Sequence, residues 1–379
     1  MLIVEIIKLR YTINKMENNH LTYFKIENFK KFDSLEVNDI GQFNLIVGDN
    51  NVGKTCLLEA LLFDEDKFQL LSNFHLALTK RGLKFQIEEI TKKVGILVTS
   101  ETLYPKENYF KEYIFGKFSD KITFNYTINS KNKNVVLKIN LKENVSKHLN
   151  GFEINSNIKF EDYVKQFICY ETDFVGDVTT YWIYDYNENI LNFPLISFND
   201  TPLEEEAKGI YENLKTKREK EILISTLKVV NPNIVDIELR ENFEDLKSIF
   251  LISFEDKDEF VPLNFLGDGF KRIFYIVLKA LSLKGKRILI DEIEIGIHYS
   301  KMKDFWVNLM KVCKELDVQL FATTHSQECI QSYLEASKET NEKDIRLIRL
   351  QENKDKSIKA ICYKEEYIEY MVESNTEER

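Results

Sequence analysis

Residues 48–55, Gly-Asp-Asn-Asn-Val-Gly-Lys-Thr, constrain the fold of this chain more than any other stretch. They lie between the apolar run 43–47, which is typical of a buried strand, and the segment 56–62, which has helical character. Glycine, four variable residues and Gly-Lys-Thr form the pattern of a phosphate-binding loop. In such a loop, backbone amides and the lysine hold phosphate oxygens, and the hydroxyl binds Mg²⁺. A helix that begins directly after the loop also favours a bound anion.

The alternative for this stretch is a plain strand-to-helix turn with a coincidental lysine. The strand before the loop and the helix after it both favour the nucleotide site. We therefore predict that ATP and Mg²⁺ bind here, with Thr55 as a metal ligand. The predicted nucleotide contacts are Gly48, Asn50, Asn51, Val52, Gly53, Lys54, Thr55 and Cys56.

The composition argues against several other classes of protein. A chain of 379 residues with 44% hydrophobic residues can bury a large core, and a net charge of −10 argues against wrapping nucleic acid by counterion release. The five cysteines are scattered without a CxxC pair, which argues against a zinc module and indicates a reducing cytoplasm. Charges interrupt every apolar run before the roughly 20 residues that a membrane span needs. Residues 1–15 resemble a short signal, but Glu5 interrupts them and no cleavage site follows, so we assign them no function.

The first third of the chain predicts mainly β-structure. Residues 23–37 alternate in hydrophobicity as two antiparallel strands do, and residues 121–141 have the pattern of a hairpin that we expect to extend them. Residues 70–83 could form a helix. The stretch 150–200 is rich in Tyr, Phe and Asn without a clear period, so its pattern predicts only a mixed insertion.

The remainder predicts helices and then an alternating pattern. Residues 202–230 indicate one long amphipathic helix, which ends near Pro232 and is followed by short strands around Ile237 and 249–254. Beyond them, helical segments alternate with apolar strands, which implies a parallel sheet. These segments are 265–283 and 298–316 for the helices and 287–290 and 319–322 for the strands.

The apolar strand 287–290 ends in two acids, Asp291 and Glu292. A strand beside the phosphate-binding loop would bring Asp291 to the Mg²⁺. Glu292 could then polarise a water for attack on the γ-phosphate, which suits a hydrolase better than a kinase. The alternative is an ordinary strand that ends in a solvated acidic loop.

His325 follows the next apolar strand, so it should emerge at the same sheet edge as Lys54 and Asp291. A lone histidine is usually structural. Its position one strand-helix-strand step after the acids instead predicts a γ-phosphate sensor. The predicted catalytic residues are therefore Glu292, Lys54 and His325, while His298 is either a hinge contact or a surface residue.

Gly267 and Gly269 begin a second helix that could bind an anion. One nucleotide cannot readily use two such helix starts of the same subunit. We therefore expect two subunits arranged head to tail, with Gly267 and Gly269 contacting the nucleotide of the partner. The alternative is a glycine-rich helix cap without a ligand.

These motifs, in this order, resemble those of the ABC-type ATPase heads of the RecF, SMC and overcoming-lysogenization-defect group. The matching stretches are "YFKIENFKKFDSLEV", "LIVGDNNVGKTCLLEAL", "LGDGFKR", "ILIDEIEIGIHYS" and "FATTHS". The resemblance implies an α/β P-loop ABC-type ATPase head with an antiparallel β lobe and an inserted α/β lobe. It also implies that Lys54 and Thr55 bind phosphate and Mg²⁺, and that Asp291, Glu292 and His325 are the Walker B acid, the catalytic base and the switch histidine.

The domain boundaries follow from the positions of these motifs. We expect an N-terminal extension (1–21), the first part of the head (22–63), an inserted lobe (64–254) and the second part of the head (255–379). Gly267 replaces the serine that ABC signatures carry, so one side-chain contact to the γ-phosphate is missing, and hydrolysis should be either slow or differently arranged.

The sequence after His325 has no Toprim spacing of acids and no HNH-like histidine pair. The chain is therefore similar to ATPase subunits of bacterial anti-phage modules, such as AriA of PARIS and PtuA of Septu. We expect a cytoplasmic homo-oligomer, at least a dimer, that hydrolyses ATP and regulates a separate effector: a Toprim or HNH nuclease, or a toxin.

Two other functions remain open at this point. A RecF-like repair ATPase would bind duplex DNA, with a basic cluster such as Lys215, Lys217, Arg218 and Lys220 on one face. That cluster could equally be a solvated helix face. A small-molecule kinase would use the same phosphate-binding loop, but it needs neither the second helix start nor Glu292.

Overall fold

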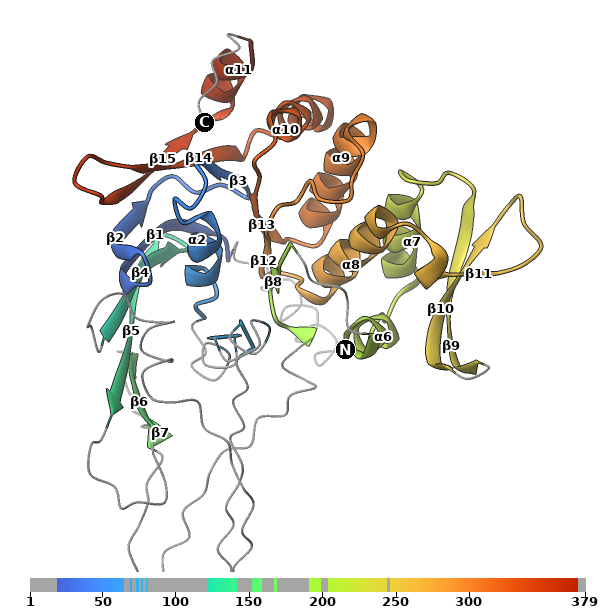
Figure 1. Cartoon of the computed structure of the whole chain (residues 1–379), viewed down its shortest axis with the longest axis horizontal. Helices are drawn as coiled ribbons and strands as arrows, with labels where there is room; N and C mark the ends of the chain where they lie inside the picture. Colours follow the sequence, from blue (N-terminus) through green and yellow to red (C-terminus); the bar gives the residue numbers. More distant parts are fainter. Residues whose placement is uncertain are drawn as a thin grey trace, which may run out of the picture.

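The structure is a computed structural model that describes residues 19–64, 121–141, 152–158, 167–168, 191–198, 204–243 and 246–373, with a few positions between 69 and 80. They form three β-sheets with helices between and beside them (Figure 1). The predictions for 1–15, for most of 70–83 and for most of 150–200 lie outside the described residues. No helix in the described part of the chain is long and apolar enough to cross a membrane.

The central sheet carries the strand that leads into the phosphate-binding loop. Its six strands have the order β15-β14-β3-β13-β12-β8, and all pair in parallel except the edge strand β15. Their bounds are Phe43–Gly48 (β3), Leu195–Ile196 (β8), Arg287–Ile290 (β12), Gln319–Thr323 (β13), Ile345–Glu352 (β14) and Ile358–Tyr363 (β15). The predicted parallel sheet is confirmed. Strand β8 belongs to this sheet although it falls within 64–254, the range predicted as the inserted lobe.

The two faces of the central sheet contribute to separate hydrophobic cores. On β3, Leu45 and Val47 pack in the larger core and Ile46 packs in the other, because successive side chains of a strand point to opposite faces. Three helices cover the first face and α2 covers the second (Figure 1). Their bounds are Lys54–Ala60 (α2), Asp268–Ser282 (α8), Tyr299–Glu315 (α9) and Gln327–Thr340 (α10).

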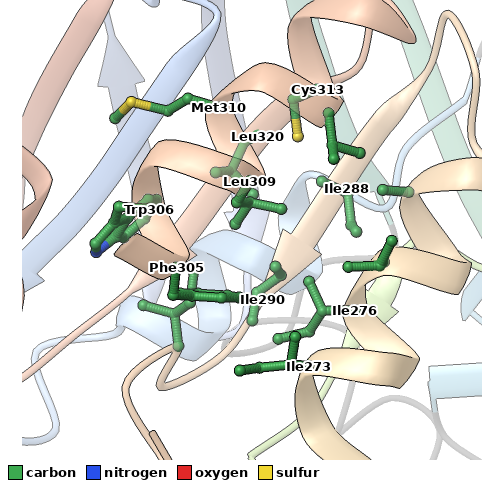
Figure 2. Close-up of a cluster of buried hydrophobic side chains, with 14 of the residues drawn as sticks. Ile273, Ile276, Ile288, Ile290, Phe305, Trp306, Leu309, Met310, Cys313 and Leu320 are labelled. Carbon is green, nitrogen blue, oxygen red and sulfur yellow. The ribbon is translucent and has the colours of Figure 1, made fainter. Parts of the chain in front are cut away.

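Helices α8 and α9 meet over strand β12. Figure 2 shows Ile273 and Ile276 of α8 beside Ile290 of β12, with Phe305 of α9 close by. All four side chains are buried. Each buried aliphatic or aromatic side chain of this kind stabilises the fold by about 1.5–3 kcal/mol, so α8 is firmly attached to the strand that ends at Asp291.

An antiparallel sheet lies on the other side of α2 (Figure 1). Its order is β2-β1-β4-β5-β6-β7, and the hairpin β4–β5 pairs with β1, which confirms that it extends the opening strands. Phe63 joins the layers by stacking on Phe24 and Phe124, with ring centroids 5.1 and 5.8 Å apart. The strands are Leu21–Phe29 (β1), Phe32–Val37 (β2), Lys121–Ile128 (β4), Lys131–Leu141 (β5), Phe152–Ile158 (β6) and Phe167–Ile168 (β7).

The prediction of one long helix over 202–230 is wrong, because two helices occupy this range. They are α6 (Glu204–Glu212) and α7 (Lys217–Leu227). Thr216 starts α7 with a capping box in which its side chain accepts from the Glu219 N–H and Glu219 accepts from the Thr216 N–H. Burial would raise the Glu219 pKa, but hydrogen bonds from Lys284 and from the Thr216 and Lys215 backbones lower it to about 2.

Helix α6 is joined to α8 by a buried polar cluster. The Lys279 ammonium lies 2.8 Å from Glu206 Oε1, and the Tyr275 hydroxyl donates to Glu206 Oε2 at 2.8 Å. The strands predicted after these helices are present in a small outer sheet with the order β11-β10-β9. The remaining elements are Ile234–Phe243 (β9), Leu246–Phe254 (β10), Val261–Pro262 (β11), the short 3₁₀ helix Leu263–Phe265 (η1) and Glu365–Glu373 (α11).

Candidate active site

The phosphate-binding loop joins β3 to α2, as predicted. Gly48 has a φ of 144°, and a Cβ there would lie 2.4 Å from the Leu350 carbonyl oxygen, so this position requires glycine. Asn50 and Asn51 are exposed, while Val52 and Gly53 are buried. Thr55 and Cys56 follow on the first turn of α2 and are partly buried.

The Lys54 side chain turns back over the loop. It is only 6% exposed, and its ammonium donates to the carbonyl oxygens of Gly48 at 2.7 Å and Asp49 at 2.9 Å. Burial lowers the Lys54 pKa, although the nearby Asp291 and Asp49 carboxylates act in the opposite direction. A lysine in this position can exchange its carbonyl partners for phosphate oxygens, which are stronger acceptors because they are charged.

Asp291 lies between the loop and the neighbouring strand β13. Its carboxylate accepts from the Thr55 hydroxyl at 3.1 and 3.3 Å and from the Thr323 hydroxyl at 2.6 Å. Thr55 and Asp291 together offer hydroxyl and carboxylate oxygens, the ligand types that Mg²⁺ prefers. Among the described residues, no group of three or more His, Cys, Asp or Glu side chains is arranged to hold a metal ion, so a cation at this site would also need phosphate and water oxygens.

Glu292 has an unusual backbone conformation. Its φ is 49°, in the left-handed region that residues other than glycine rarely adopt. Thr323 supports this conformation twice: its hydroxyl accepts from the Glu292 N–H at 2.8 Å, and its carbonyl accepts from the Ile293 N–H at 3.0 Å. The Glu292 side chain is partly exposed. Strain of this kind is concentrated at functional sites, and here it is located at the predicted base.

His325 emerges two residues after β13, at the same sheet edge as Lys54 and Asp291. Its backbone N–H donates to Glu294 Oε1 at 2.9 Å, and the residue is exposed. Glu294 therefore links the segment after β12 to the segment after β13. The structure thus gathers the loop, both acids and His325 at the carboxyl edge of three adjacent parallel strands, where ligands bind in open α/β sheets.

Gly267 and Gly269, the predicted second helix start, have different surroundings. A Cβ at Gly267 would meet nothing within 4 Å, whereas a Cβ at Gly269 would lie 1.9 Å from the Gly296 carbonyl oxygen. Gly269 therefore brings the start of α8 against the loop after Asp291 within the same chain. Phe265, which precedes Gly267, is 81% exposed.

Sequence reasoning gave no role to Thr323, Glu294 or Arg272. Arg272 is buried on α8, and its guanidinium donates to the Asp291 carbonyl at 2.8 Å and the Ser197 carbonyl at 2.7 Å. The available sequence signal was that Thr323 directly follows the apolar run 319–322, as Asp291 directly follows 287–290. The parallel register pairs Ile290 with Ala322, so the next residues of the two strands, Asp291 and Thr323, had to be neighbours.

The remaining candidates have local partners. His298 caps α9 and accepts from the Ser300 N–H at 3.3 Å, which identifies it as a helix cap. In the predicted basic cluster, Arg218 pairs with Glu315 at 2.7 Å and Lys220 pairs with Asp236 at 2.7 Å. Both cations are therefore opposed by carboxylates.

Comparisons with known proteins relate this chain to ATPases. Residues 199–330, which contain Gly267, Asp291 and His325, match the family model of an AAA ATPase domain. An ATP/GTP phosphatase from Helicobacter pylori is 26% identical over 330 residues, which are 81% of this chain and 85% of that protein. The chain is an ATPase.

Two solved structures show the same fold. One is an SmcHead bound to the C-winged helix domain of ScpA, with a TM-score of 0.51 and 11% identity over 92% of this chain and 99% of that chain. The other is the Smc head domain with an extended coiled coil from Pyrococcus furiosus, bound to the C-terminal domain of ScpA. Its TM-score is 0.51 and its identity 11%, over 94% of this chain and 99% of that chain. The fold is that of an ABC-type ATPase head.

Proposed function

We propose that this ATPase binds the triphosphate of ATP over the loop 48–55 and that Glu292 is the base that activates the attacking water. The main support for this proposal is that Lys54, Asp291 and Glu292 lie at one edge of the sheet. There the Thr55 hydroxyl is 3.1 Å from the Asp291 carboxylate. Lys54 would neutralise phosphate charge. Glu292 would accept the water proton, and His325 would contact the γ-phosphate.

Thr55 and Asp291 fit a Mg²⁺ ion, because both present oxygen atoms at the end of the phosphate-binding loop. When bound there, the ion would supply positive charge that offsets the negative charge developing during phosphoryl transfer. Thr323 would keep the Asp291 carboxylate oriented through the hydroxyl contact of 2.6 Å. In this arrangement Thr323 positions the metal ligand and also supports the backbone of the base.

We further propose that ATP joins two subunits head to tail, with the start of α8 contacting the nucleotide of the partner. Two features support this proposal. Gly267 faces open space, and Phe265, two residues before it, is exposed. Ile295 and Tyr299 are also exposed, on the segment around Gly296 that contacts Gly269. Exposed apolar groups next to a polar site are typical of surfaces that another protein covers.

The assembly would regulate a separate effector in anti-phage defence, as the resemblance to AriA and PtuA suggests. The effector would be a nuclease of the Toprim or HNH type, or a toxin. If ATP binding joins the subunits, the assembled and separate forms present different surfaces, and a separate effector could bind to only one of them. ATP turnover would then set how long the effector remains bound or released.

The test of this proposed function compares Glu292→Gln with Glu255→Gln, a control at an exposed glutamate after β10. Loss of a general base lowers turnover by about 10²–10⁴-fold, so phosphate release should fall by that factor in Glu292→Gln and remain normal in the control. ATP binding should persist, and light scattering should show an ATP-dependent dimer that accumulates in Glu292→Gln. Parallel assays with GTP would define the nucleotide, since the Helicobacter pylori relative is named an ATP/GTP phosphatase. Normal turnover in Glu292→Gln would refute the assignment of the base.

A further inference from the structure

Arg272 connects helix α8 to the strand that carries the acids. It lies one turn after Gly269 and is 7% exposed. Its Nη2 donates to the Asp291 carbonyl at 2.8 Å, and its Nη1 donates to the Ser197 carbonyl at 2.7 Å, just after β8. Charged donors give stronger hydrogen bonds than neutral ones, and the planar guanidinium suits two acceptors at fixed positions.

Helix α8 contacts the segment 291–296 at two points. Arg272 holds the Asp291 carbonyl, and Gly269 lies so close to Gly296 that a Cβ would come within 1.9 Å of its carbonyl oxygen. Residues three apart on a helix share a face, so both contacts lie on one side of α8. The segment between them contains Glu292 with its left-handed backbone. Helix α8 therefore contacts the chain on both sides of the base.

The start of α8 is also the part of the helix that faces outward. The Asp268 side chain is 92% exposed, and Gly267 faces open space. Farther along, α8 is attached to β12 through Ile273 and Ile276 (Figure 2). Arg272 lies between this outward-facing start and the apolar attachment. It is the residue through which α8 contacts the Asp291 carbonyl.

We propose that Arg272 is a positioning residue that places Glu292 of its own subunit when the start of α8 meets the nucleotide of the partner. The proposal rests on the ATP-dependent assembly described above. In this sequence of events, contact with the partner's nucleotide displaces the start of α8. Arg272 transfers the displacement to the Asp291 carbonyl, and Glu292 moves toward the attacking water. Binding of ATP to one subunit thereby sets the hydrolysis rate of the other.

Single substitutions give the first test. Arg272→Lys keeps the charge but cannot reach both carbonyls with the same geometry. We expect kcat to fall about tenfold or more, which corresponds to about 1.4 kcal/mol, with ATP affinity within about twofold of the parent. Lys228→Met is the control, because Lys228 is an exposed lysine that ends α7, away from the start of α8, and it should leave kcat unchanged. Melting temperatures would be recorded for each variant.

Mixed dimers give the decisive test, because two dimers can carry the same two substitutions in different arrangements. In the first, one subunit carries both Arg272→Lys and Glu292→Gln and its partner is unchanged. In the second, one subunit carries Arg272→Lys and the other carries Glu292→Gln. Differently tagged subunits would be co-purified with ATP, so that only assembled dimers are assayed.

We expect the first dimer to keep about half of the parental turnover, since its intact Glu292 lies in the same subunit as an intact Arg272. The second dimer should lose about tenfold or more, since its only base lies beside the substituted residue. Equal turnover in the two dimers would overturn the role of Arg272 while leaving the proposed function intact. Failure of any dimer to form with ATP, or full activity of Glu292→Gln, would instead count against the proposed function itself.

Discussion

The two glycine-rich helix starts of this ATPase differ in how complete they are within one subunit. The phosphate-binding loop is closely packed: a Cβ at Gly48 would lie 2.4 Å from the Leu350 carbonyl oxygen, and the Lys54 side chain is buried. The start of α8 is open, since a Cβ at Gly267 would meet nothing within 4 Å and Phe265 is exposed. The difference fits the proposed function, in which a subunit would hold its own nucleotide on the closely packed loop and present the open start of α8 to a partner.

The largest effect should follow from removing the Lys54 ammonium of the phosphate-binding loop. Lys54→Met deletes a charged donor that would bind phosphate, and two such hydrogen bonds contribute about 3 kcal/mol or more. We expect ATP binding to weaken by about 100-fold or more in isothermal titration, with phosphate release lost. Lys228→Met, at an exposed lysine that ends α7, is the control and should bind ATP normally. Tight ATP binding by Lys54→Met would place the triphosphate elsewhere.

The next prediction compares the two glycines of the open start. Gly269→Ala forces a methyl group against the Gly296 carbonyl, and such overpacking costs about 1–3 kcal/mol. It should lower the melting temperature and also reduce turnover by about tenfold, because α8 is pushed away from Asp291. Gly267→Ala meets no obstacle and should leave the melting temperature nearly unchanged. If the two variants melted alike, the contrast between these positions would be disproved.

The last prediction is a gain in turnover rather than a loss. Gly267→Ser restores the side chain that ABC signatures carry, and the open space at this position accommodates it. A new hydrogen bond to a charged phosphate contributes about 1.5 kcal/mol or more, so turnover of the assembled protein should rise by about tenfold. Gly267→Ala serves as the control, because it adds the carbon without the hydroxyl. A rate unchanged by the serine would argue that Gly267 does not face the partner's nucleotide.

Much of the central sheet could be predicted from local patterns. Strands β3, β12 and β13 are mostly apolar, and each is followed by residues of the candidate site. Since parallel strands end at a common edge, the neighbourhood of Lys54, Asp291 and His325 followed from the order of the motifs. The break between α6 and α7 was missed because Thr216 and Glu219, which form the capping box, lie inside a charged run that is also compatible with a continuous helix.

The supporting contacts of the site could not be predicted in the same way. Arg272 acts on the Asp291 carbonyl, and Glu294 acts on the His325 N–H, so their partners are backbone groups that leave no mark in the sequence. Strand β8 pairs with β12 although the two strands lie far apart in the sequence. Contacts of this kind are set by how the elements pack, which periodicity does not encode.

The left-handed backbone at Glu292 limits how this protein can respond to selection for heat resistance. Glycine accepts that conformation readily, whereas another residue costs about 1–2 kcal/mol there. A screen that rewards only survival at high temperature would therefore tend to enrich glycine at this position and discard the carboxylate at the same time. Substitutions meant to raise the melting temperature of this ATPase should therefore be sought away from the end of β12.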